Sequence, residues 1–325
     1  MCWTRALAAA FVAAVLATGT VSAQTFPTRP ITMLVPYAPG GGTDAIARIM
    51  QESMSKSLGQ QVVVENAPGA GGTIATGRAA RAAPDGYTIL IHQVGFAAGP
   101  ALYKNLTFNV EKDFVAIGLV NTGMTLWVGR ADLPANTLEE LVSWMKQAGP
   151  EVKIGHPGFG AFGHLAGVLI ASELGSKATQ VPYRGGGPAL ADLLGGRIDL
   201  SAQTAVQTES QIKAGKLKAY AALGSVRFAG LPDVPTLAER GYKNLDFGNW
   251  HILAAPAGTP RPVIDKLNAA LQAAFADPNV DSAFSGSGMR LFPPEQRTPE
   301  AAATYLRNEI KRWGDVIRAN KIVAQ

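Results

Sequence analysis

Four glycine-rich stretches divide this chain, and each lies between an apolar run and a segment with helical spacing. The stretches are 40–42, 69–72, 158–163 and 185–187. Ile31–Val35 indicates a buried strand before the first stretch, and beyond it apolar residues recur at three- and four-residue steps as far as Leu58. A repeated order of strand, glycine loop and helix is typical of βαβ units, in which helices cover both faces of a parallel sheet.

This alternation occurs twice along the chain, over residues 31–91 and 137–223. Two extended segments, 114–120 and 125–128, join the series, and another strand is expected at 250–255. The remaining strands are expected at 62–64, 87–91, 152–155, 180–183, 198–201 and 217–223. Helices are expected at 43–58, in a short segment ending at Ala82, and at 137–148, 165–174, 188–194, 262–276 and 299–319.

More than one extended crossing between two α/β series indicates a chain that leaves a first lobe, builds a second and returns. The sequence therefore predicts an α/β protein with two doubly wound lobes. Lobe 1 is expected to contain residues 24–124 and 247–325, and lobe 2 residues 125–246. Open α/β sheets bind ligands at the carboxyl ends of their strands, so we expect a ligand cleft between the lobes.

The N-terminus has the layout of a secretory signal peptide. Arg5 precedes an uncharged apolar run at 6–16, and Val21 and Ala23 place small residues at the −3 and −1 positions of a cleavage site. We expect residues 1–23 to be removed after Ala23 and the mature protein to reside in the periplasm. The alternative, an uncleaved anchor, is disfavoured because no stop-transfer segment follows and no later stretch approaches ~20 continuous apolar residues.

Composition and motifs exclude several function classes. The net charge is only +5, and no basic run is interleaved with aromatic residues, so nucleic-acid binding is not expected. The chain has no G-x-S-x-G elbow, no phosphate-binding loop followed by Lys-Ser or Lys-Thr, and no H-E-x-x-H pair. The four histidines, His92, His156, His164 and His251, suggest no complete ligand set for a metal. We therefore expect neither an enzyme nor a metal or cofactor site.

A glycine loop before a helix is a suitable place for an anion, because its backbone N–H groups and the helix dipole face the ligand. The alternative is that these glycine loops are only tight turns between a strand and a helix. Gly158–Gly163 also matches the G-x-G-x-x-G dinucleotide fingerprint. The next strand ends in Pro182-Tyr183-Arg184, without the acidic residue for a ribose, although Arg184 would suit a 2′-phosphate. An NADP-like oxidoreductase is therefore the alternative function, disfavoured by export.

Several longer motifs resemble one family of solute receptors. They are Pro36–Asp44 (PYAPGGGTD), Glu65–Gly72 (ENAPGAGG), Ala83–Tyr87 (APDGY), Tyr183–Gly186 (YRGG), Leu231–Thr236 (LPDVPT) and Ala255–Pro260 (APAGTP). From about Thr28 to the C-terminus the chain is similar to the receptors of tripartite tricarboxylate transporters, also called the Bordetella uptake gene (Bug) family. The chain departs from the family pattern at Ala161, where Ser or Thr is usual, and at Ala202–Gln203.

The resemblance implies a monomeric Venus-flytrap receptor that closes on a small organic carboxylate and delivers it to membrane permease subunits, or to a sensor domain. It implies that the first glycine loop and the second-lobe loop grip a carboxylate between them. It further implies that residues after two strands meet the far end of the ligand. The expected ligand-binding residues are Tyr37, Pro39, Gly40, Gly41, His92, Gln93, Gly158, Phe159, Gly160, Ala161, Phe162, Gln203 and Thr204.

Aromatic residues lie near these loops, namely Tyr37, Phe96, Phe159 and Phe162. Aromatic side chains around an anion site favour a ligand with a flat apolar body. The sequence thus suggests an aromatic mono- or dicarboxylate over a small aliphatic acid. The alternative is that the phenylalanines pack into their own lobes.

Overall fold

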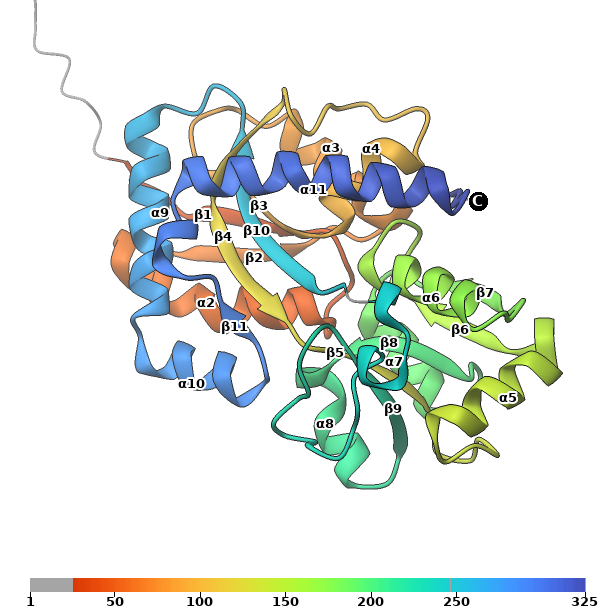
Figure 1. The fold of residues 1–325 in the computed structure, drawn as a ribbon. Helices are drawn as coiled ribbons and strands as arrows, with labels where there is room; N and C mark the ends of the chain where they lie inside the picture. The colour runs from red at the N-terminus through yellow and green to blue at the C-terminus, as the bar shows by residue number, and fades with distance from the viewer. Residues whose placement is uncertain (1–25, 246, 325) are drawn as a thin grey trace, which may run out of the picture.

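The computed structural model describes residues 26–245 and 247–324 and has two mixed α/β lobes (Figure 1). The expected two-lobed α/β architecture is confirmed. The predicted signal peptide, residues 1–23, lies outside the described residues. Within the described ranges, no helix combines the length and the apolar character needed to cross a membrane.

The larger sheet has the strand order β11-β4-β10-β3-β1-β2. Its strands are β1 (Ile31–Val35), β2 (Val62–Asn66), β3 (Thr88–Gln93), β4 (Phe114–Gly123), β10 (Asn249–Pro256) and β11 (Arg290–Leu291). Strands β2, β1 and β3 are parallel, as the βαβ pattern predicts. Strand β10 is antiparallel to β3 and to β4. Strands β4 and β10 are long, and they connect the lobes in opposite directions.

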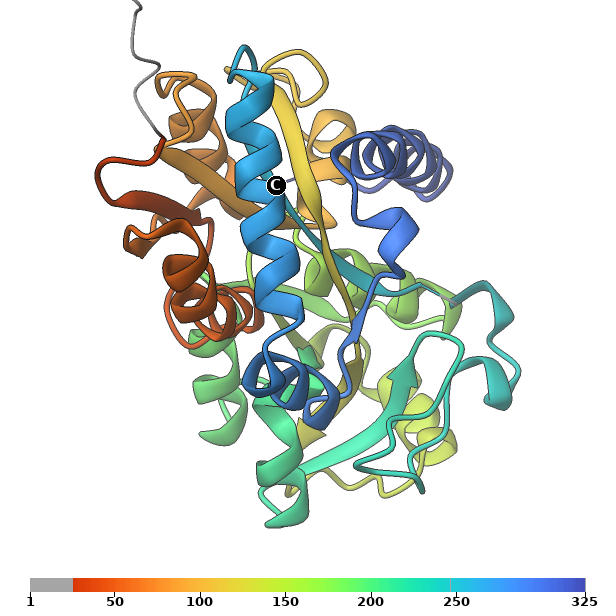
Figure 2. The same cartoon turned by 90° about the vertical axis from the view of Figure 1, so that its left-hand side faces the viewer.

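Helices cover both faces of this sheet. They are α2 (Gly42–Leu58), α3 (Thr73–Ala80), α4 (Gly95–Leu102), α9 (Arg261–Phe275), α10 (Pro278–Gly286) and α11 (Pro299–Ala319). Along β1 successive side chains alternate between faces, so Met33 joins the core under α2 and α9 while Leu34 joins the core under α4 and α11. Figure 2 shows α9 and α11 on opposite sides of the sheet.

The smaller sheet has the order β7-β6-β8-β5-β9. Its strands are β5 (Thr125–Arg130), β6 (Lys153–His156), β7 (Thr179–Pro182), β8 (Leu200–Thr204) and β9 (Leu217–Leu223). Its helices are α5 (Leu138–Ala148), α6 (Phe162–Glu173), α7 (Gly186–Leu194) and α8 (Ala205–Lys213). Short 3₁₀ turns lie at Ala70–Gly72, Gly149–Glu151, Ala238–Arg240, Lys243–Leu245 and Pro294–Gln296.

The chain passes between the sheets where β4 continues into β5, and it returns before β10 (Figure 1). Residues 31–123 and 249–291 supply the larger sheet, and residues 125–223 supply the smaller one. We propose that the lobe boundaries lie at 124/125 and 246/247. These positions separate the strands of the larger sheet from those of the smaller one, and no strand spans either boundary.

Helices α4, α8 and α10 have no counterpart in the sequence analysis. Helix α4 reads GFAAGPAL and is buried along most of its length, so apolar residues do not alternate with polar ones. Helix α8 buries only Ala205 and Thr208 and is otherwise polar. In both helices the packing of the lobe, rather than an amphipathic pattern, decides the conformation.

Candidate functional site

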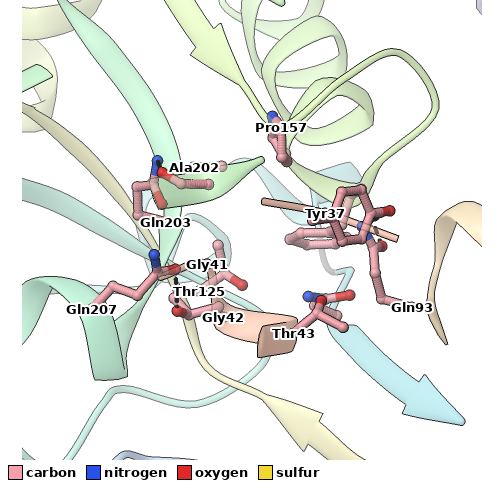
Figure 3. Close-up of a pocket in the computed structure, with 15 residues that line it drawn as sticks. Tyr37, Gly41, Gly42, Thr43, Gln93, Thr125, Pro157, Ala202, Gln203 and Gln207 are labelled. Carbon is pink, nitrogen blue, oxygen red and sulfur yellow. Dashed lines mark hydrogen bonds between the residues drawn. The ribbon is translucent and has the colours of Figure 1, made fainter. Parts of the chain in front are cut away.

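A cavity of about 50 Å³ lies between the two lobes. At ~10–15 Å³ for each water, this volume admits a few water molecules or one short organic ion. Figure 3 shows Tyr37 and Gln93 of lobe 1 on one side and Gln203 and Gln207 of lobe 2 on the other. The lining residues are Tyr37, Gly41, Gly42, Thr43, Gln93, Thr125, Pro157, Phe162, Gly163, Gly186, Ala202, Gln203, Thr204, Gln207 and Asn249.

Four helices begin at this cavity. The first residues of α2, α6 and α7 line it, namely Gly42, Phe162 and Gly186, and Thr204 lines it as the residue before α8. None of these four helices is capped by the side chain of the residue before it, although the first N–H of α6 donates to Gln93 Oε1 and the first N–H of α8 donates to the Met124 carbonyl. The first N–H groups of a helix have no acceptor within the helix, and the helix dipole makes this end positive. Two lobes therefore direct four positive helix ends at one small space.

Among the described residues, no Asp, Glu, Lys, Arg or His lines the cavity. Asp44, in the first turn of α2, lies outside the lining and is paired with Arg48 at 3.0 Å. The positive potential of the site therefore comes from backbone dipoles rather than from cationic side chains. Backbone N–H groups at helix ends bind carboxylates, phosphates and sulfate, so the arrangement favours an anion.

Tyr37 and Gln93 form a hydrogen-bonded pair at the lobe interface. The Gln93 Nε2 group donates to Tyr37 Oη at 2.7 Å, and Gln93 Oε1 accepts from the N–H of Gly95 and, across the interface, from the N–H of Phe162 at 3.2 Å. Burial raises the pKa of Tyr37 above its usual value. Since Tyr37 Oη accepts from Gln93, its own proton is available to a ligand in the cavity.

Further hydrogen bonds hold the lobes together around the cavity. The Ala38 N–H donates to the Arg184 carbonyl at 2.9 Å, and Gln207 Nε2 donates to the Gly40 carbonyl at 2.9 Å. On the other side, Tyr103 Oη donates to the Phe159 carbonyl at 2.7 Å. The structure therefore shows the closed arrangement of the two lobes.

Six of the residues that sequence reasoning selected line the cavity together: Tyr37, Gly41, Gln93, Phe162, Gln203 and Thr204. The first glycine loop faces a different partner from the one that the resemblance implied. An ideal Cβ on Gly41 would lie 3.4 Å from the N–H nitrogen of Gly186, so residues 37–41 face the 184–187 loop rather than 158–161.

The loop at 158–161 instead packs against the second glycine loop. A Cβ on Gly71 would lie 1.9 Å from the Phe159 carbonyl oxygen, and a Cβ on Gly158 would lie 3.0 Å from Gly71 Cα. Glycine is required here because two backbones meet at the lobe interface. Gly158, Phe159, Gly160 and Ala161 consequently do not line the cavity, although their neighbours Pro157 and Phe162 do.

Three other predicted residues also lie outside the lining. Pro39 and Gly40 are exposed, and the φ of Gly40 is +79°, in the left-handed region that favours glycine. His92 is buried behind Gly72 and stacks on Phe96. Burial lowers the pKa of His92 to about 3, so its imidazole is neutral near pH 7.

Sequence reasoning missed nine lining residues: Gly42, Thr43, Thr125, Pro157, Gly163, Gly186, Ala202, Gln207 and Asn249. For some, the sequence contained a signal. Gly42 and Gly186 belong to the glycine stretches, and Gln207 lies one helical turn after Thr204, whose Oγ1 donates to Gln207 Oε1 at 2.7 Å. Thr125 and Asn249 have no such signal, because they reach the cavity only through the crossing of the two lobes.

The histidines near the third glycine loop support that loop. His156 Nδ1 accepts from the N–H of Gly158 at 3.3 Å, and His164 Nδ1 accepts from the N–H of Gly160 at 3.2 Å. Burial lowers the pKa of His156 to about 3 and that of His164 to about 4. In the part of the chain that the structure describes, no group of three His, Cys, Asp or Glu residues is arranged to hold a metal ion.

Of the four aromatic residues near the loops, Phe159 and Phe96 pack on histidines, whereas Tyr37 and Phe162 line the cavity. The ring of Phe159 contacts His156 and His164, each at 5.1 Å between ring centroids. Phe96 packs on His92 and Phe114. Phe162 lines the cavity but is almost fully buried, and its ring packs edge-on against Phe247 at 5.9 Å.

Comparisons with known proteins agree with this geometry. The family model described as "Tripartite tricarboxylate transporter family receptor" matches residues 46–322. A protein of Agrobacterium vitis, described as a UPF0065 protein in the TAR-I ttuE-ttuC' intergenic region, is 42% identical over 310 residues, which cover 94% of this chain and 90% of that protein.

Two solved structures resemble this one over nearly their whole length. The periplasmic binding protein BugD has a TM-score of 0.88 and 40% identity, covering 91% of this chain and 99% of BugD. MatC from Rhodopseudomonas palustris with bound malate has a TM-score of 0.87 and 38% identity, covering 90% of this chain and 100% of MatC. The chain therefore belongs to the tripartite tricarboxylate transporter receptor family, whose members are periplasmic solute-binding receptors rather than enzymes.

Proposed function

We propose that this receptor captures a short aliphatic carboxylate in the periplasm and delivers it to the permease subunits of a tripartite tricarboxylate transporter. The proposal rests on the convergence of four helix N-termini, none capped by the side chain of its preceding residue, on a cavity that no charged side chain of the described residues lines. Such a site suits a carboxylate, whose oxygens accept several N–H bonds at once.

The size and lining of the cavity support an aliphatic ligand over an aromatic one. A space of about 50 Å³ matches a compact acid. Phe159 and Phe96 do not line it, and the ring of Phe162 already packs on Phe247. The malate bound by the related MatC is a ligand of this kind. The alternative, a dinucleotide at Gly158–Gly163, is disfavoured because the backbone of this loop packs against Gly71 instead of lining the cavity.

Export and assembly remain part of the proposal. We propose cleavage after Ala23, which intact-mass analysis of periplasmic protein would check: a mass that retains residues 1–23 contradicts it. We further propose that the receptor works as a monomer, which a sedimentation measurement of the mature protein tests.

The central experiment is calorimetric titration of the mature protein with C3–C6 aliphatic acids, benzoate and phthalate. We expect an aliphatic acid to bind more tightly than either aromatic acid. We also expect its affinity to stay constant from about pH 6 to about pH 9, because no lining group titrates there: the pKa of Tyr37 is raised by burial. Tighter binding of benzoate or phthalate would contradict the aliphatic assignment, and no binding of any carboxylate would contradict the receptor function proposed here.

A further inference from the structure

Two buried polar side chains in the cavity lack hydrogen-bond partners. Thr125 is 1% exposed and Asn249 is 7% exposed, and both line the cavity. Within the described residues, Thr125 Oγ1 and Asn249 Oδ1 make no hydrogen bond. Buried polar atoms in proteins are nearly always paired, so two unpaired atoms on residues that line the same cavity point to groups that a ligand completes.

Both side chains lie where the chain passes between the lobes. Thr125 is the first residue of β5, and Asn249 is the first residue of β10. Asn249 pairs with Gly123, the last residue of β4, and Thr125 pairs with Thr204 of β8. The two groups therefore form the hinge side of the cavity and are held by strand pairing rather than by flexible loops.

Their chemistry defines what this part of the ligand must be. The Asn249 amide offers an acceptor and a donor, and the Thr125 hydroxyl can do either. A carboxylate only accepts hydrogen bonds and would be repelled by Asn249 Oδ1. An ammonium group only donates hydrogen bonds. Its charge would also be buried without a counter-charge, because no acidic side chain of the described residues lines the cavity. A hydroxyl group both donates and accepts, and it is uncharged.

We propose that Thr125 and Asn249 form a hydroxyl subsite, and that the receptor selects hydroxycarboxylates over the same acids without the hydroxyl. This inference rests on the proposed carboxylate-binding function and adds a second recognition point to it. The helix N-termini bind the carboxylate, and the hinge-side pair identifies the hydroxyl. A site built to hydrogen-bond a ligand hydroxyl rejects the analogue that lacks it, because its own polar groups then stay unpaired.

The test compares acids that differ by one hydroxyl: malate with succinate, and lactate with propionate. For the native protein we expect the hydroxy acid of at least one pair to bind at least tenfold more tightly. In Thr125→Val, which keeps the shape and removes the hydroxyl, this ratio should fall several-fold towards one. Thr125→Ser, which keeps the hydroxyl, should retain most of the ratio. Asn249→Leu should lower it as Thr125→Val does.

Thr259→Val is the matched control. Thr259 is also buried, but its Oγ1 donates to the Pro256 carbonyl at 2.7 Å, beyond the far end of β10. We expect this variant to keep the hydroxyl preference and to unfold at a lower temperature. Thr125→Val should unfold no earlier than the native protein, because it breaks no internal hydrogen bond.

Three outcomes would overturn the subsite. Equal binding of hydroxy and deoxy acids by the native protein would remove it while the receptor function stands. If Thr125→Val and Asn249→Leu both keep the native ratio of hydroxy-acid to deoxy-acid affinity, then other residues recognise the hydroxyl. Failure of every carboxylate to bind would overturn the proposed function, and the subsite with it.

Discussion

Helices that begin at the cavity differ from several helices that begin elsewhere in whether a side chain caps their first turn. Away from the cavity, α5, α10 and α11 are capped by their own side chains: Thr137, Asp277 and Thr298 each accept an N–H bond from the first turn. At the cavity, α2, α6, α7 and α8 follow Gly41, Ala161, Gly185 and Thr204, none of whose side chains caps its helix. Helices α3, α4 and α9 begin away from the cavity and also lack a side-chain cap. Among the described helices, side-chain caps therefore occur only away from the cavity, although not on every helix there.

The uncapped helix ends are a cost to stability that a ligand can offset. A side-chain cap contributes about 0.5–2 kcal/mol, so a helix end without one, such as that of α2 or α7, leaves a stabilisation of this order that binding can supply. Ligand binding and lobe closure then stabilise the same structure, because the N–H groups that a ligand would pair belong to helices of both lobes. Binding of an anion should therefore raise the unfolding temperature.

The largest expected effect comes from giving a cavity helix its own cap. Gly41 has φ −82°, which any residue adopts, and a Cβ there would lie 3.4 Å from the Gly186 nitrogen, an ordinary contact. In Gly41→Asp the new carboxylate would cap α2 and approach the N–H groups of α7. We expect the affinity for the carboxylate ligand to fall at least 100-fold, about 2.7 kcal/mol, in calorimetric titration.

Gly41→Asn is the matched control for that substitution. It adds the same shape without the charge, so its loss of affinity should be clearly smaller than that of Gly41→Asp. If the two variants bind equally, the effect is steric and the anion site is not electrostatic. Native affinity in Gly41→Asp would show that these N–H groups do not contact the ligand.

A smaller effect is expected from crowding the first residue of α2. A Cβ on Gly42 would lie 2.6 Å from Thr204 Cγ2, so Gly42→Ala pushes the two lobes apart. We expect about a tenfold weaker affinity, about 1.4 kcal/mol. In a Thr204→Ser background, which lacks that methyl group, the cost of Gly42→Ala should be smaller. A double-mutant cycle measures the difference, and an equal cost in both backgrounds would contradict the contact.

The smallest effects are expected where the caps are already present. Thr137 Oγ1 accepts from the Glu140 N–H at 3.1 Å, and Thr298 Oγ1 accepts from the Ala301 N–H at 3.2 Å. Thr137→Ala and Thr298→Ala should each lower the free energy of unfolding by about 1 kcal/mol in urea titration. Neither should change ligand affinity, since neither helix begins at the cavity. A loss of affinity with intact stability would contradict the division between the two groups of helices.

Much of the architecture is local and could therefore be predicted. Apolar runs such as Ile31–Val35 and Leu217–Leu223 are strands with the expected bounds, and the Thr137–Glu140 spacing marks the start of α5. Helix α4 could not be predicted in this way, because a segment buried on nearly all sides shows no period. The glycine stretches were expected to receive a ligand or to form tight turns, and at Gly71 and Gly158 the structure shows that they let two backbones meet.

The site itself depended on contacts between distant parts of the chain. Sequence reasoning could place Tyr37 and Gln93 after strands, because loops at carboxyl ends line such clefts. It could not tell that residues 37–41 face the 184–187 loop, or that Gly71 packs on Phe159. These pairings follow from how the two lobes close, and no local pattern encodes that geometry.

The sequence alone therefore determined the two α/β series, the family and the four glycine turns, since periodicity and φ preferences act over a few residues. The tertiary structure decided which helix ends share a cavity and which polar atoms remain for a ligand. Thr125 and Asn249 illustrate why the tertiary structure was needed. They lie 124 positions apart in the sequence, and only strand pairing at the lobe crossing places both in one cavity.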